Sequence, residues 1–379
     1  MVKLFERRRI TVVILVSVII SIGLLITLQT NAIEAIRIKI DEVKTTPPPP
    51  LQDDQEKYRP WVRPSYLEID KAEFANKEEK IAYVTFLSGT VDQDDDLEKD
   101  NYLQAVRILV WQLVHNPETR TKHDVVVMVT PTVSKSRRER LAKDGATIYP
   151  VEFLHTSNDS WVQAEQHRWD DVMTKMRVWE MTQYSRIIML DGDTMLRSSL
   201  DGVLDDPGAQ ILKTKDIASV NYKPLPGEAP LPETYLLASN VEVWDSSHAF
   251  PPKEGTGLKH EGYMNAGFFV LAPSIPAFEL YKSWLNIPGS FDPKYPEQNL
   301  MNKVHKWSGP MPWREVAYTW NIRCPTENDF AHGLVSMHEK WWKQPYLYEN
   351  KKVKDWLFTR RYEMKGWYEA WDLKNEKRS

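Results

Sequence analysis

The stretch RIIMLDGDTMLRSSLDGVL, from Arg186 to Leu204, decides the fold class. Four apolar residues, Ile187 to Leu190, run without interruption and end at the triplet Asp191-Gly192-Asp193. A short, continuous apolar run next to turn-forming residues is typical of a strand that is buried on both faces. In open parallel sheets, ligands bind beyond the carboxyl ends of the strands. We therefore expect the two carboxylates to lie at a ligand site.

The chain on the N-terminal side of this stretch alternates between strand patterns and helix patterns. Apolar, β-branched runs predict strands within 81–87, 123–131 and 146–154. Apolar residues at helical spacing or capping signals predict helices within 101–116, 134–145 and 169–185. This alternation predicts an α/β fold with a doubly wound, mainly parallel sheet.

Composition excludes some classes of protein. The 49 basic and 53 acidic residues give a net charge of -4, so no overall positive field indicates a nucleic-acid partner. The single cysteine, Cys324, cannot form an intramolecular disulfide. These numbers fit a large globular domain and leave its oligomeric state open.

The N-terminal residues predict membrane anchoring. Residues 1–9 end in three arginines and precede an uncharged run. Residues 10–29 are long enough, at about 1.5 Å per residue, to span a bilayer as a signal-anchor. The basic flank predicts that residues 1–9 stay cytoplasmic and that the rest is lumenal. Residues 30–79 include a run of four prolines and predict an extended stem before a catalytic domain at 80–379.

The Asp-Gly-Asp triplet is suited to binding a divalent cation. Carboxylate oxygens are the ligands that Mg²⁺ and Mn²⁺ prefer, and a bound phosphate commonly completes the coordination. A calcium loop would continue with another acidic residue and then glycine, but Thr194 follows here. A phosphatase with an Asp-x-Asp nucleophile and a plain solvated turn remain open alternatives.

Several ordered segments resemble one enzyme family. Residues 174–205, TKMRVWEMTQYSRIIMLDGDTMLRSSLDGVLD, resemble the glycogenin-like glycosyltransferases of family 8. The resemblance continues in AYVTFLSG, YMNAGFFVLAPS, PEQNLMNKV and HGLVSMHEKWW, and it covers roughly residues 80–343. In this chain Ala266 stands where the family has serine, and Glu297 stands where it has aspartate. The resemblance implies a GT-A fold, the nucleotide-diphosphosugar transferase architecture.

The resemblance also implies roles for individual residues. Asp191 and Asp193 would hold Mn²⁺ or Mg²⁺, with His338 as a third protein ligand and His332 as its rival. Lys175 would contact the sugar phosphate and take part in catalysis, and Glu297 and Gln298 would face the reacting centre. The remaining donor contacts would come from Thr85, Leu87, Tyr102, Arg168, Gly192, Asn265, Gly267 and Lys340.

The implied activity is sugar transfer with retention of configuration from a UDP-sugar, either UDP-GlcNAc or UDP-Glc. The acceptor would be a glycan or a glycoprotein, and the location would be the Golgi membrane as a single-pass type II protein. Attack on the face that the diphosphate leaves and a covalent role for Glu297 both stay open. So do a catalytically silent glycan-binding scaffold and a self-glucosylating primer. The sequon at Asn158 is compatible with a lumenal domain.

Aromatic residues are concentrated in the C-terminal half. Most tryptophans pack in cores, but some stack on sugars, so we expect one or two of a group of five to contact carbohydrate. That group is Trp307, Trp313, Trp320, Trp341 and Trp342. Residues 352–371 predict a helix rich in basic and aromatic residues, and we expect it to pack on the domain rather than on a membrane.

Overall fold

The computed structural model describes residues 79–89, 96–166, 171–254, 256–258 and 262–376. All of these belong to one compact unit, Pro60–Ser379. The predicted cytoplasmic tail, the signal-anchor at 10–29 and nearly all of the stem lie outside the described residues. Among the helices that are described, none combines the length and the apolar character needed to cross a membrane.

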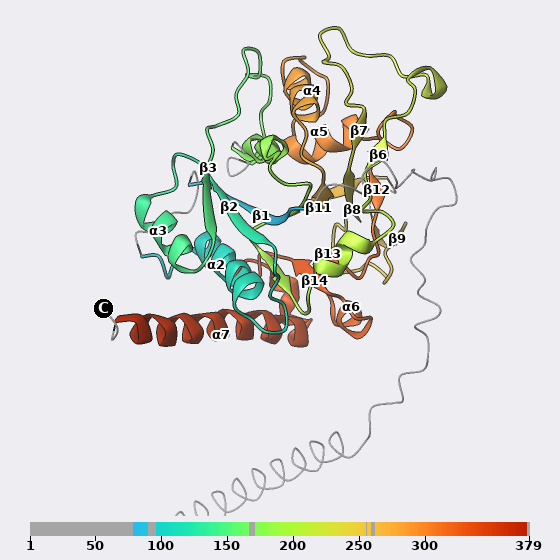
Figure 1. Cartoon of the computed structure of the whole chain (residues 1–379). Coiled ribbons are helices and arrows are strands. Elements are labelled where there is room, and N and C mark those ends of the chain that lie inside the picture. Colours follow the sequence, from blue (N-terminus) through green and yellow to red (C-terminus); the bar gives the residue numbers. More distant parts are fainter. Residues whose placement is uncertain (1–78, 90–95, 167–170, 255, 259–261, 377–379) are drawn as a thin grey trace, which may run out of the picture. The chain divides into compact units, whose positions relative to one another are not determined.

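A seven-stranded sheet forms the centre of the domain (Figure 1). Its strand order is β12-β8-β11-β4-β1-β2-β3. Four neighbouring pairs, including β1 with β4, are parallel, and β11 is antiparallel to both of its neighbours. The strands are β1 (Ile81–Leu87), β2 (Asp124–Val129), β3 (Thr147–Pro150), β4 (Arg186–Leu190), β8 (Leu237–Val241), β11 (Met264–Leu271) and β12 (Arg314–Glu315). The predicted mainly parallel α/β sheet is confirmed.

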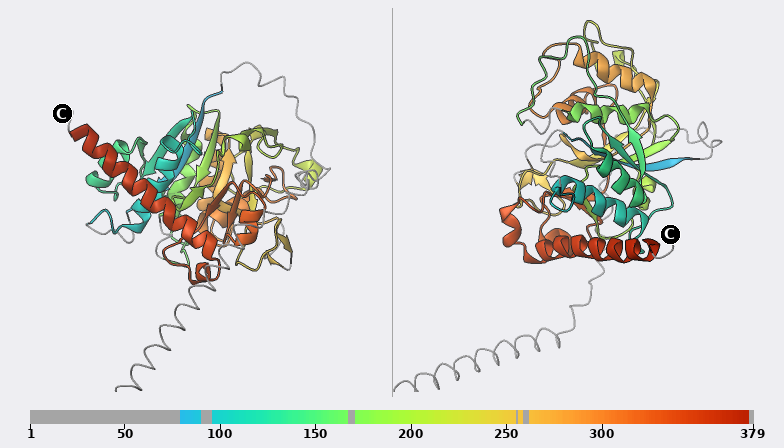
Figure 2. Two further views of the ribbon diagram at one scale, coloured as in Figure 1. Left: turned by 90° about the horizontal axis from the view of Figure 1, so that it is seen from below. Right: turned by 90° about the vertical axis from the view of Figure 1, so that its left-hand side faces the viewer.

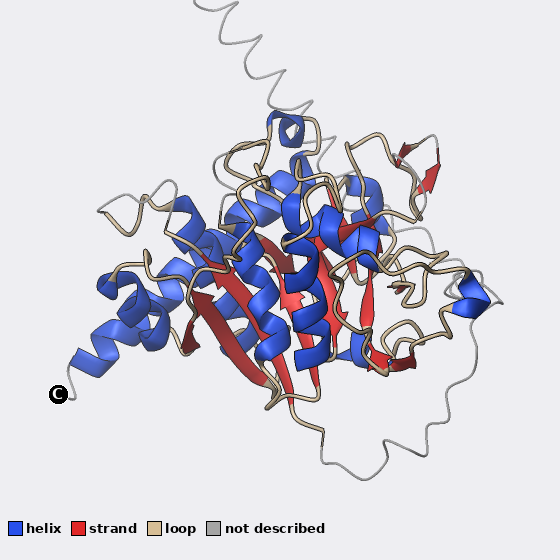
Figure 3. Cartoon of the chain, turned by 90° about the horizontal axis from the view of Figure 1, so that it is seen from above, coloured by secondary structure: helices blue, strands red, loops and turns tan. Residues whose placement is uncertain are grey.

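Helices cover both faces of this sheet (Figure 3). Alternate residues of each strand point to opposite faces, so Ile187 and Met189 join one apolar cluster while Ile188 and Leu190 join another. The cluster of Ile187 contains side chains of the 3₁₀ helix η4 (Val172–Glu180), α4 (Ile275–Leu285) and α5 (Pro296–Val304). The cluster of Leu190 contains those of α2 (Asn101–Val114) and α3 (Lys135–Lys143). Continuous apolar strands are therefore required, because neither face meets water.

A small second sheet extends the end of β4. Its order is β13-β14-β5, from β13 (Asn321–Arg323), β14 (Ser336–His338) and β5 (Thr194–Leu196). The antiparallel register places His338 opposite Thr194, next to the Asp-Gly-Asp triplet. This pairing joins residues that are far apart in the sequence at one end of the main sheet.

The long helix α7 (Lys351–Glu376) packs against α2 along one side of the domain (Figure 2). It belongs to a third apolar cluster with Met337 of β14 and Trp341. The predicted C-terminal helix is therefore confirmed, and it packs on the domain. The remaining short elements are η5 (Asp201–Asp205), β6 (Leu212–Lys213), η6 (Ala218–Val220), β7 (Thr234–Tyr235), β9 (Lys253–Glu254), β10 (Gly257–Leu258), α6 (Glu327–Ala331) and η7 (Pro345–Tyr348).

Local sequence explains where the two helices nearest β1 and β2 begin. Asp100 caps α2 by accepting a hydrogen bond from the backbone N–H of Leu103 at 2.9 Å. Ser134 caps α3 in the same way, because its side chain accepts a hydrogen bond from the backbone N–H of Arg137. By contrast, Asp171 makes no side-chain cap for η4, and that segment winds as a 3₁₀ helix rather than the expected α-helix. The difference matters because η4 carries Lys175.

The buried His305 predicts acid sensitivity of the fold. Burial lowers the pKa of His305 to about 4. Its Nδ1–H donates to the carbonyl of Met311 at 2.7 Å, and its Nε2 accepts from the hydroxyl of Tyr281 at 2.5 Å, so the neutral ring is fully paired. The folded-state pKa lies below the usual 6.5, so the unfolded chain binds the proton first. The contribution of neutral His305 to the free energy of unfolding is therefore fully present above about pH 6.5, and it is lost as the pH drops towards 4.

We expect this histidine to account for a loss of roughly 2 to 3 kcal/mol in unfolding free energy between pH 7.5 and 4.5. His305→Gln keeps a donor and an acceptor without the titration, so urea unfolding of that variant should show a smaller loss over the same interval. An equal loss in both proteins would contradict the assignment. His332→Gln, at the end of α6, serves as the control substitution.

Candidate active site

The Asp-Gly-Asp triplet forms a tight turn between β4 and β5. The backbone N–H of Asp191 donates to the carbonyl of Gly267 at 2.7 Å, and that of Thr194 donates back to Asp191 at 3.0 Å. A Cβ atom at Gly192 would lie 2.5 Å from a methyl group of Val106, so helix α2 can approach only because residue 192 has no side chain. The glycine thus keeps both carboxylates next to the wall formed by α2.

Each carboxylate is paired with a lysine, which is buried in the case of Lys175 and 23% exposed in the case of Lys340. Lys175 Nζ lies 2.7 Å from Asp191 Oδ1 and 3.3 Å from Glu297 Oε1. Lys340 Nζ lies 2.7 Å from Asp193 Oδ2. The side chain of Lys175 is 3% exposed, whereas that of Asp191 is 32% exposed and open to a ligand. Five of the predicted site residues, Lys175, Asp191, Asp193, Glu297 and Lys340, therefore meet in neighbouring ion pairs.

Electrostatics keep this cluster charged. Burial would lower the pKa of Lys175, but Asp191 and Glu297 outweigh it and raise that pKa above its ordinary value. Burial would raise the pKa of Asp193, but Lys340 and His338 lower it to about 2. The pKa of Lys340 is raised by Asp193 against the effect of its own burial. Lys175 and Lys340 therefore stay positively charged and Asp193 stays negatively charged at neutral pH.

His338 lies at this cluster and His332 does not. His338 is buried at the end of β14, and its Nδ1 has no hydrogen-bond partner within the described residues. Its ring fills the space beside Gly267, where a Cβ atom would lie 2.6 Å from Cε1. His332 instead lies at the end of α6, where its ring stacks on that of Phe250 with the ring centroids 5.1 Å apart. The strand-end histidine is therefore the better placed of the two.

Two carboxylates and an imidazole have the donor chemistry that Mn²⁺ requires. Within the part of the chain that the structure describes, however, no three such side chains are grouped closely enough to hold a metal ion. Asp191 and Asp193 instead bind lysine ammonium groups. The donor set, together with the unpaired Nδ1 of His338, fits a divalent cation, provided that the side chains move closer together.

The first cavity, of about 150 Å³, lies on the β1 and α2 side of the carboxylates. Leu87 and Tyr102 line it, whereas Thr85, the third nucleoside contact that the resemblance implies, is buried in β1 and is not one of the lining residues. The hydroxyl groups of Thr85 and Tyr102 are both buried, with no hydrogen-bond partner among the described residues. Buried polar groups without partners are rare in native proteins, so the hydroxyl of Tyr102, which lines this cavity, indicates a polar ligand there. The other lining residues are Phe86, Ser88, Val106, Asp171, Val172, Lys175, Asp191, Gly192, Asp193, Glu297 and Lys340.

The second cavity, of about 240 Å³, adjoins the first through Asp191, Glu297 and Lys340, which line both. Asn265, Gly267, Gln298 and His338, to which the resemblance assigns donor, catalytic or metal roles, line it. Gln298 Oε1 accepts from the backbone N–H of Ala266 at 2.9 Å, which fixes α5 to β11. The residues in its wall that sequence reasoning missed are Gln166, Glu242, Trp244, Tyr295 and Arg323.

Glu242 and Arg323 stand out among the missed residues. Arg323 Nη1 lies 2.8 Å from Glu242 Oε1, and the side-chain amide of Asn265 donates to the other oxygen of Glu242. The tryptophan that lines the second cavity is Trp244. None of the five tryptophans named in the sequence analysis is among the residues that line these two cavities. Arg168, also predicted as a phosphate contact, lies outside the described residues.

Tyr102→Phe tests whether the first cavity binds a polar ligand. Removing a buried hydroxyl that has no protein partner should leave the unfolding free energy unchanged or slightly higher. If the hydroxyl pairs with the ligand, UDP affinity should fall about fivefold, the worth of one hydrogen bond. Calorimetric titration with UDP and urea unfolding measure the two quantities. A clear loss of stability without loss of affinity would assign the hydroxyl to the fold instead.

Comparisons with known proteins identify relatives of this chain. No protein-family model matches it. An uncharacterised protein of Schizosaccharomyces pombe is 26% identical over 269 residues, which cover 65% of this chain and 69% of that protein. Galactinol synthase 3 of Arabidopsis thaliana is 27% identical over 230 residues, which cover 60% of this chain and 62% of the synthase. The similarity thus spans less than two thirds of this plant relative.

Solved structures also resemble the domain. An active-site mutant of LgtC aligns with a TM-score of 0.43 and 12% identity over 75% of this chain and 95% of that one. The apo form of mouse xyloside xylosyltransferase 1 aligns with a TM-score of 0.39 and 12% identity over 69% and 97%, respectively.

The carboxylate turn at the end of the mainly parallel sheet and the sequence relatives indicate the class of this protein, which is a glycosyltransferase. Its ordered motifs and the similarity to several galactinol synthases place it more closely. These relatives support an assignment to the glycogenin-like glycosyltransferases of family 8.

Proposed function

We propose that the protein transfers a sugar from UDP-GlcNAc or UDP-Glc to a glycan or glycoprotein acceptor, with retention of configuration and with a bound Mn²⁺ or Mg²⁺. The observation that supports this most is the pair of cavities that meet at Asp191, Glu297 and Lys340. A donor whose diphosphate lies at that junction would place its nucleotide in one cavity and its sugar in the other. The class of reaction follows from the family, and the donor and acceptor are the proposal.

The first cavity suits the nucleoside. Leu87 and Val106 give it apolar walls, and Tyr102 offers both an aromatic ring and an unpaired hydroxyl. These features match an aromatic base attached to a polar ribose.

The junction suits the diphosphate. The charged ammonium groups of Lys175, which is buried, and of Lys340, which is partly exposed, already lie there. When the phosphates leave the sugar, negative charge develops on them, and fixed cations stabilise that charge. Asp191, Asp193 and His338 would hold the divalent ion, which supplies further stabilisation of the leaving group. The ammonium of Lys340 would then be available to a phosphate oxygen.

The second cavity suits the sugar. Asn265 and Gln298 provide amide groups for hydroxyls, and Trp244 and Tyr295 provide aromatic surface. Retention requires either attack from the face that the diphosphate leaves or a double displacement. In the first route a diphosphate oxygen takes the acceptor proton, so the chain needs to orient the acceptor only. Glu297, held at 3.3 Å from Lys175, is the candidate nucleophile for the second route.

The experiment uses the purified full-length chain with UDP-Glc, UDP-GlcNAc and UDP-Gal. We expect Mn²⁺-stimulated UDP release from at least one donor, and we expect a chelator to abolish it. Failure of all three donors together with no affinity for UDP would overturn the proposal and favour a silent scaffold. Phosphate release with Mg²⁺ and no nucleotide sugar would favour the phosphatase. A mass increase of the protein itself would identify a self-glucosylating primer.

We also propose a single-pass type II location in the Golgi membrane, with the catalytic domain in the lumen. Its basis is the sequence of residues 1–29, which lie outside the described residues. The sequon is exposed at Asn158. Protease protection of the domain in intact vesicles and a glycosidase-sensitive size shift that Asn158→Gln removes would support this topology. Full digestion of the domain in intact vesicles would overturn it.

A further inference from the structure

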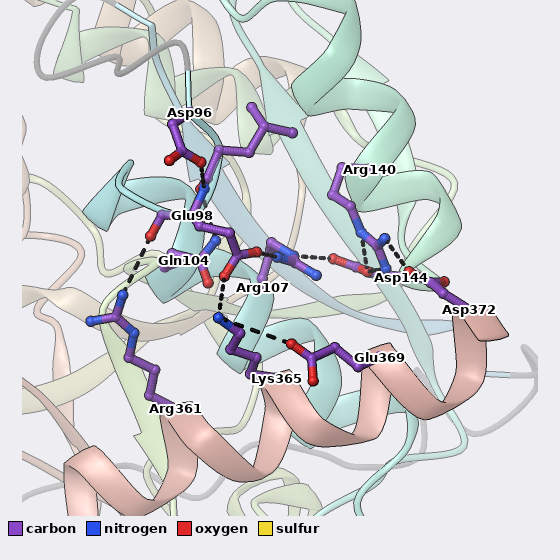
Figure 4. Close-up of polar contacts among 11 residues, drawn as sticks. Asp96, Glu98, Gln104, Arg107, Arg140, Asp144, Arg361, Lys365, Glu369 and Asp372 are labelled. Carbon is purple, nitrogen blue, oxygen red and sulfur yellow. Dashed lines mark hydrogen bonds and ion pairs between the residues drawn. The ribbon is translucent and has the colours of Figure 1, made fainter.

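Helix α7 is fixed to the domain by a network of charges that lies outside both cavities (Figure 4). Asp144, which is fully buried, accepts from Arg107 of α2 at 2.7 Å and pairs with Arg140 of α3. Arg140 Nη1 also lies 2.7 Å from Asp372 of α7, and Tyr368 of α7 donates to the backbone carbonyl of Asp144 at 3.1 Å. Buried, mutually paired charges of this kind fix α7 in one position on α2 and α3.

A second set of contacts runs from the other part of α7 towards the first cavity. Phe358 of α7 meets Trp341 edge to face, with ring centroids 5.3 Å apart. Trp341 meets Trp342 in the same manner at 5.3 Å, and Trp342 meets Tyr102 at 5.4 Å. The guanidinium of Arg361 lies over Trp341 at 5.4 Å. We call Phe358, Trp341, Trp342 and Tyr102 the aromatic chain.

The aromatic chain reaches the site at two points, at its end in Tyr102 and at Trp341, which follows Lys340. Tyr102 lines the first cavity, and Lys340, the residue before Trp341, lines both cavities and binds Asp193. Trp341 is 3% exposed, and edge-to-face ring contacts are directional, so a shift of Phe358 cannot be absorbed without moving its neighbours. Lys340 has little freedom, because its backbone N–H also donates to Glu339 at 2.8 Å.

We propose that α7 positions the donor site through the aromatic chain. Phe358 and Arg361 hold Trp341 and Trp342, which in turn set the ring of Tyr102 and the backbone that carries Lys340. Phe358 is a positioning residue, since it lines neither of the two cavities. The inference rests on the proposed function, because it takes the first cavity and Lys340 to bind a nucleoside diphosphate.

A matched pair of substitutions separates positioning from stability. Trp367, on the same helix, stacks on His115 of α2 with centroids 4.0 Å apart and has no part in the aromatic chain. Phe358→Ala and Trp367→Ala both remove a large ring that fixes α7, and both should lower the midpoint of urea unfolding. Only Phe358→Ala removes a contact that leads to Tyr102 and Lys340.

The test is calorimetric titration of the full-length protein with UDP in the presence of Mn²⁺. We expect Phe358→Ala to weaken UDP binding about threefold to tenfold, the size of coupling found for residues without ligand contact. Trp367→Ala should stay within about twofold of the wild type, and Phe358→Tyr, which keeps the ring, should restore affinity. Should Phe358→Ala fail to fold, Phe358→Leu replaces it with a smaller expected loss.

Three results would overturn the inference. They are an unchanged affinity in Phe358→Ala, an equal loss of affinity in Trp367→Ala, and no recovery in Phe358→Tyr. A wild-type protein that does not bind UDP at all would instead overturn the proposed function, and this inference with it. Failure of this inference and failure of the proposed function are distinguishable, because the three variant results are interpreted only if the wild-type protein binds UDP.

Discussion

Asp193→Asn is expected to reduce Mn²⁺-dependent UDP release by about 100-fold or more, the typical effect of removing one main electrostatic contact to a developing charge. The substitution keeps the shape of the side chain and an oxygen that can accept from Lys340, which lies at 2.7 Å in the wild type. It removes the charge that a divalent ion needs. Donor hydrolysis and Mn²⁺ titration by calorimetry measure the two losses, and both should fall together.

The acid stability of the same variant provides an independent measurement. Burial would raise the pKa of Asp193, but Lys340 and His338 lower it to about 2, below the value near 3.9 of an unfolded chain. The charged form therefore stabilises the fold above about pH 4, and this contribution is lost as the pH falls towards 2. Asp193→Asn should lack that part of the acid transition.

Asp201→Asn is the matched control. Asp201 begins η5, beyond β5, and accepts from the hydroxyl of Tyr83 at 2.6 Å, but it lines neither of the two cavities. UDP release should stay close to that of the wild type. If Asp193→Asn retained full activity with Mn²⁺, the carboxylate pair could not be the centre of the site.

The sequence predicts this carboxylate pair well because the signal is local. An unbroken apolar run followed by Asp-Gly-Asp needs only neighbouring residues to indicate a buried strand with acids at its end, and β4 and its turn have that form. The local pattern also favours His338 over His332 as the third metal ligand, because His338 is the last residue of a strand. The alternation of patterns likewise predicts the parallel strands β1, β2 and β4.

Other features depend on contacts between distant parts of the chain. Lys340 and Asp193 are 147 residues apart, and Lys175 and Glu297 are 122 apart, so no spacing reveals their pairing. Glu242 and Arg323 reach the second cavity from the neighbourhoods of β8 and β13, in two different sheets. Similarly, the 3₁₀ winding of η4 has no local pattern that separates it from an α-helix. Tertiary contacts decide each of these features.

Lys175→Met should affect both the fold and the reaction. In the wild type one ammonium group, 3% exposed, neutralises Asp191 and Glu297, and the latter is itself 13% exposed. Removing one partner of a buried ionic cluster leaves uncompensated charge, which typically costs about 3 kcal/mol or more. Two carboxylates would also face the position proposed for the diphosphate, so UDP release should fall by about 100-fold or more.

The double variant Lys175→Met with Glu297→Gln separates these two effects. It removes one of the two unpaired carboxylates, so urea unfolding should recover part of the lost stability. Activity should not recover, because the ammonium group is still absent. As a control for the loss of a lysine, Lys282→Met breaks an exposed pair with Glu279, at 2.9 Å, and should change stability by about 1 kcal/mol or less. Recovery of UDP release in the double variant would mean that Lys175 only neutralises its neighbours, and its proposed contact with the diphosphate would have to be abandoned.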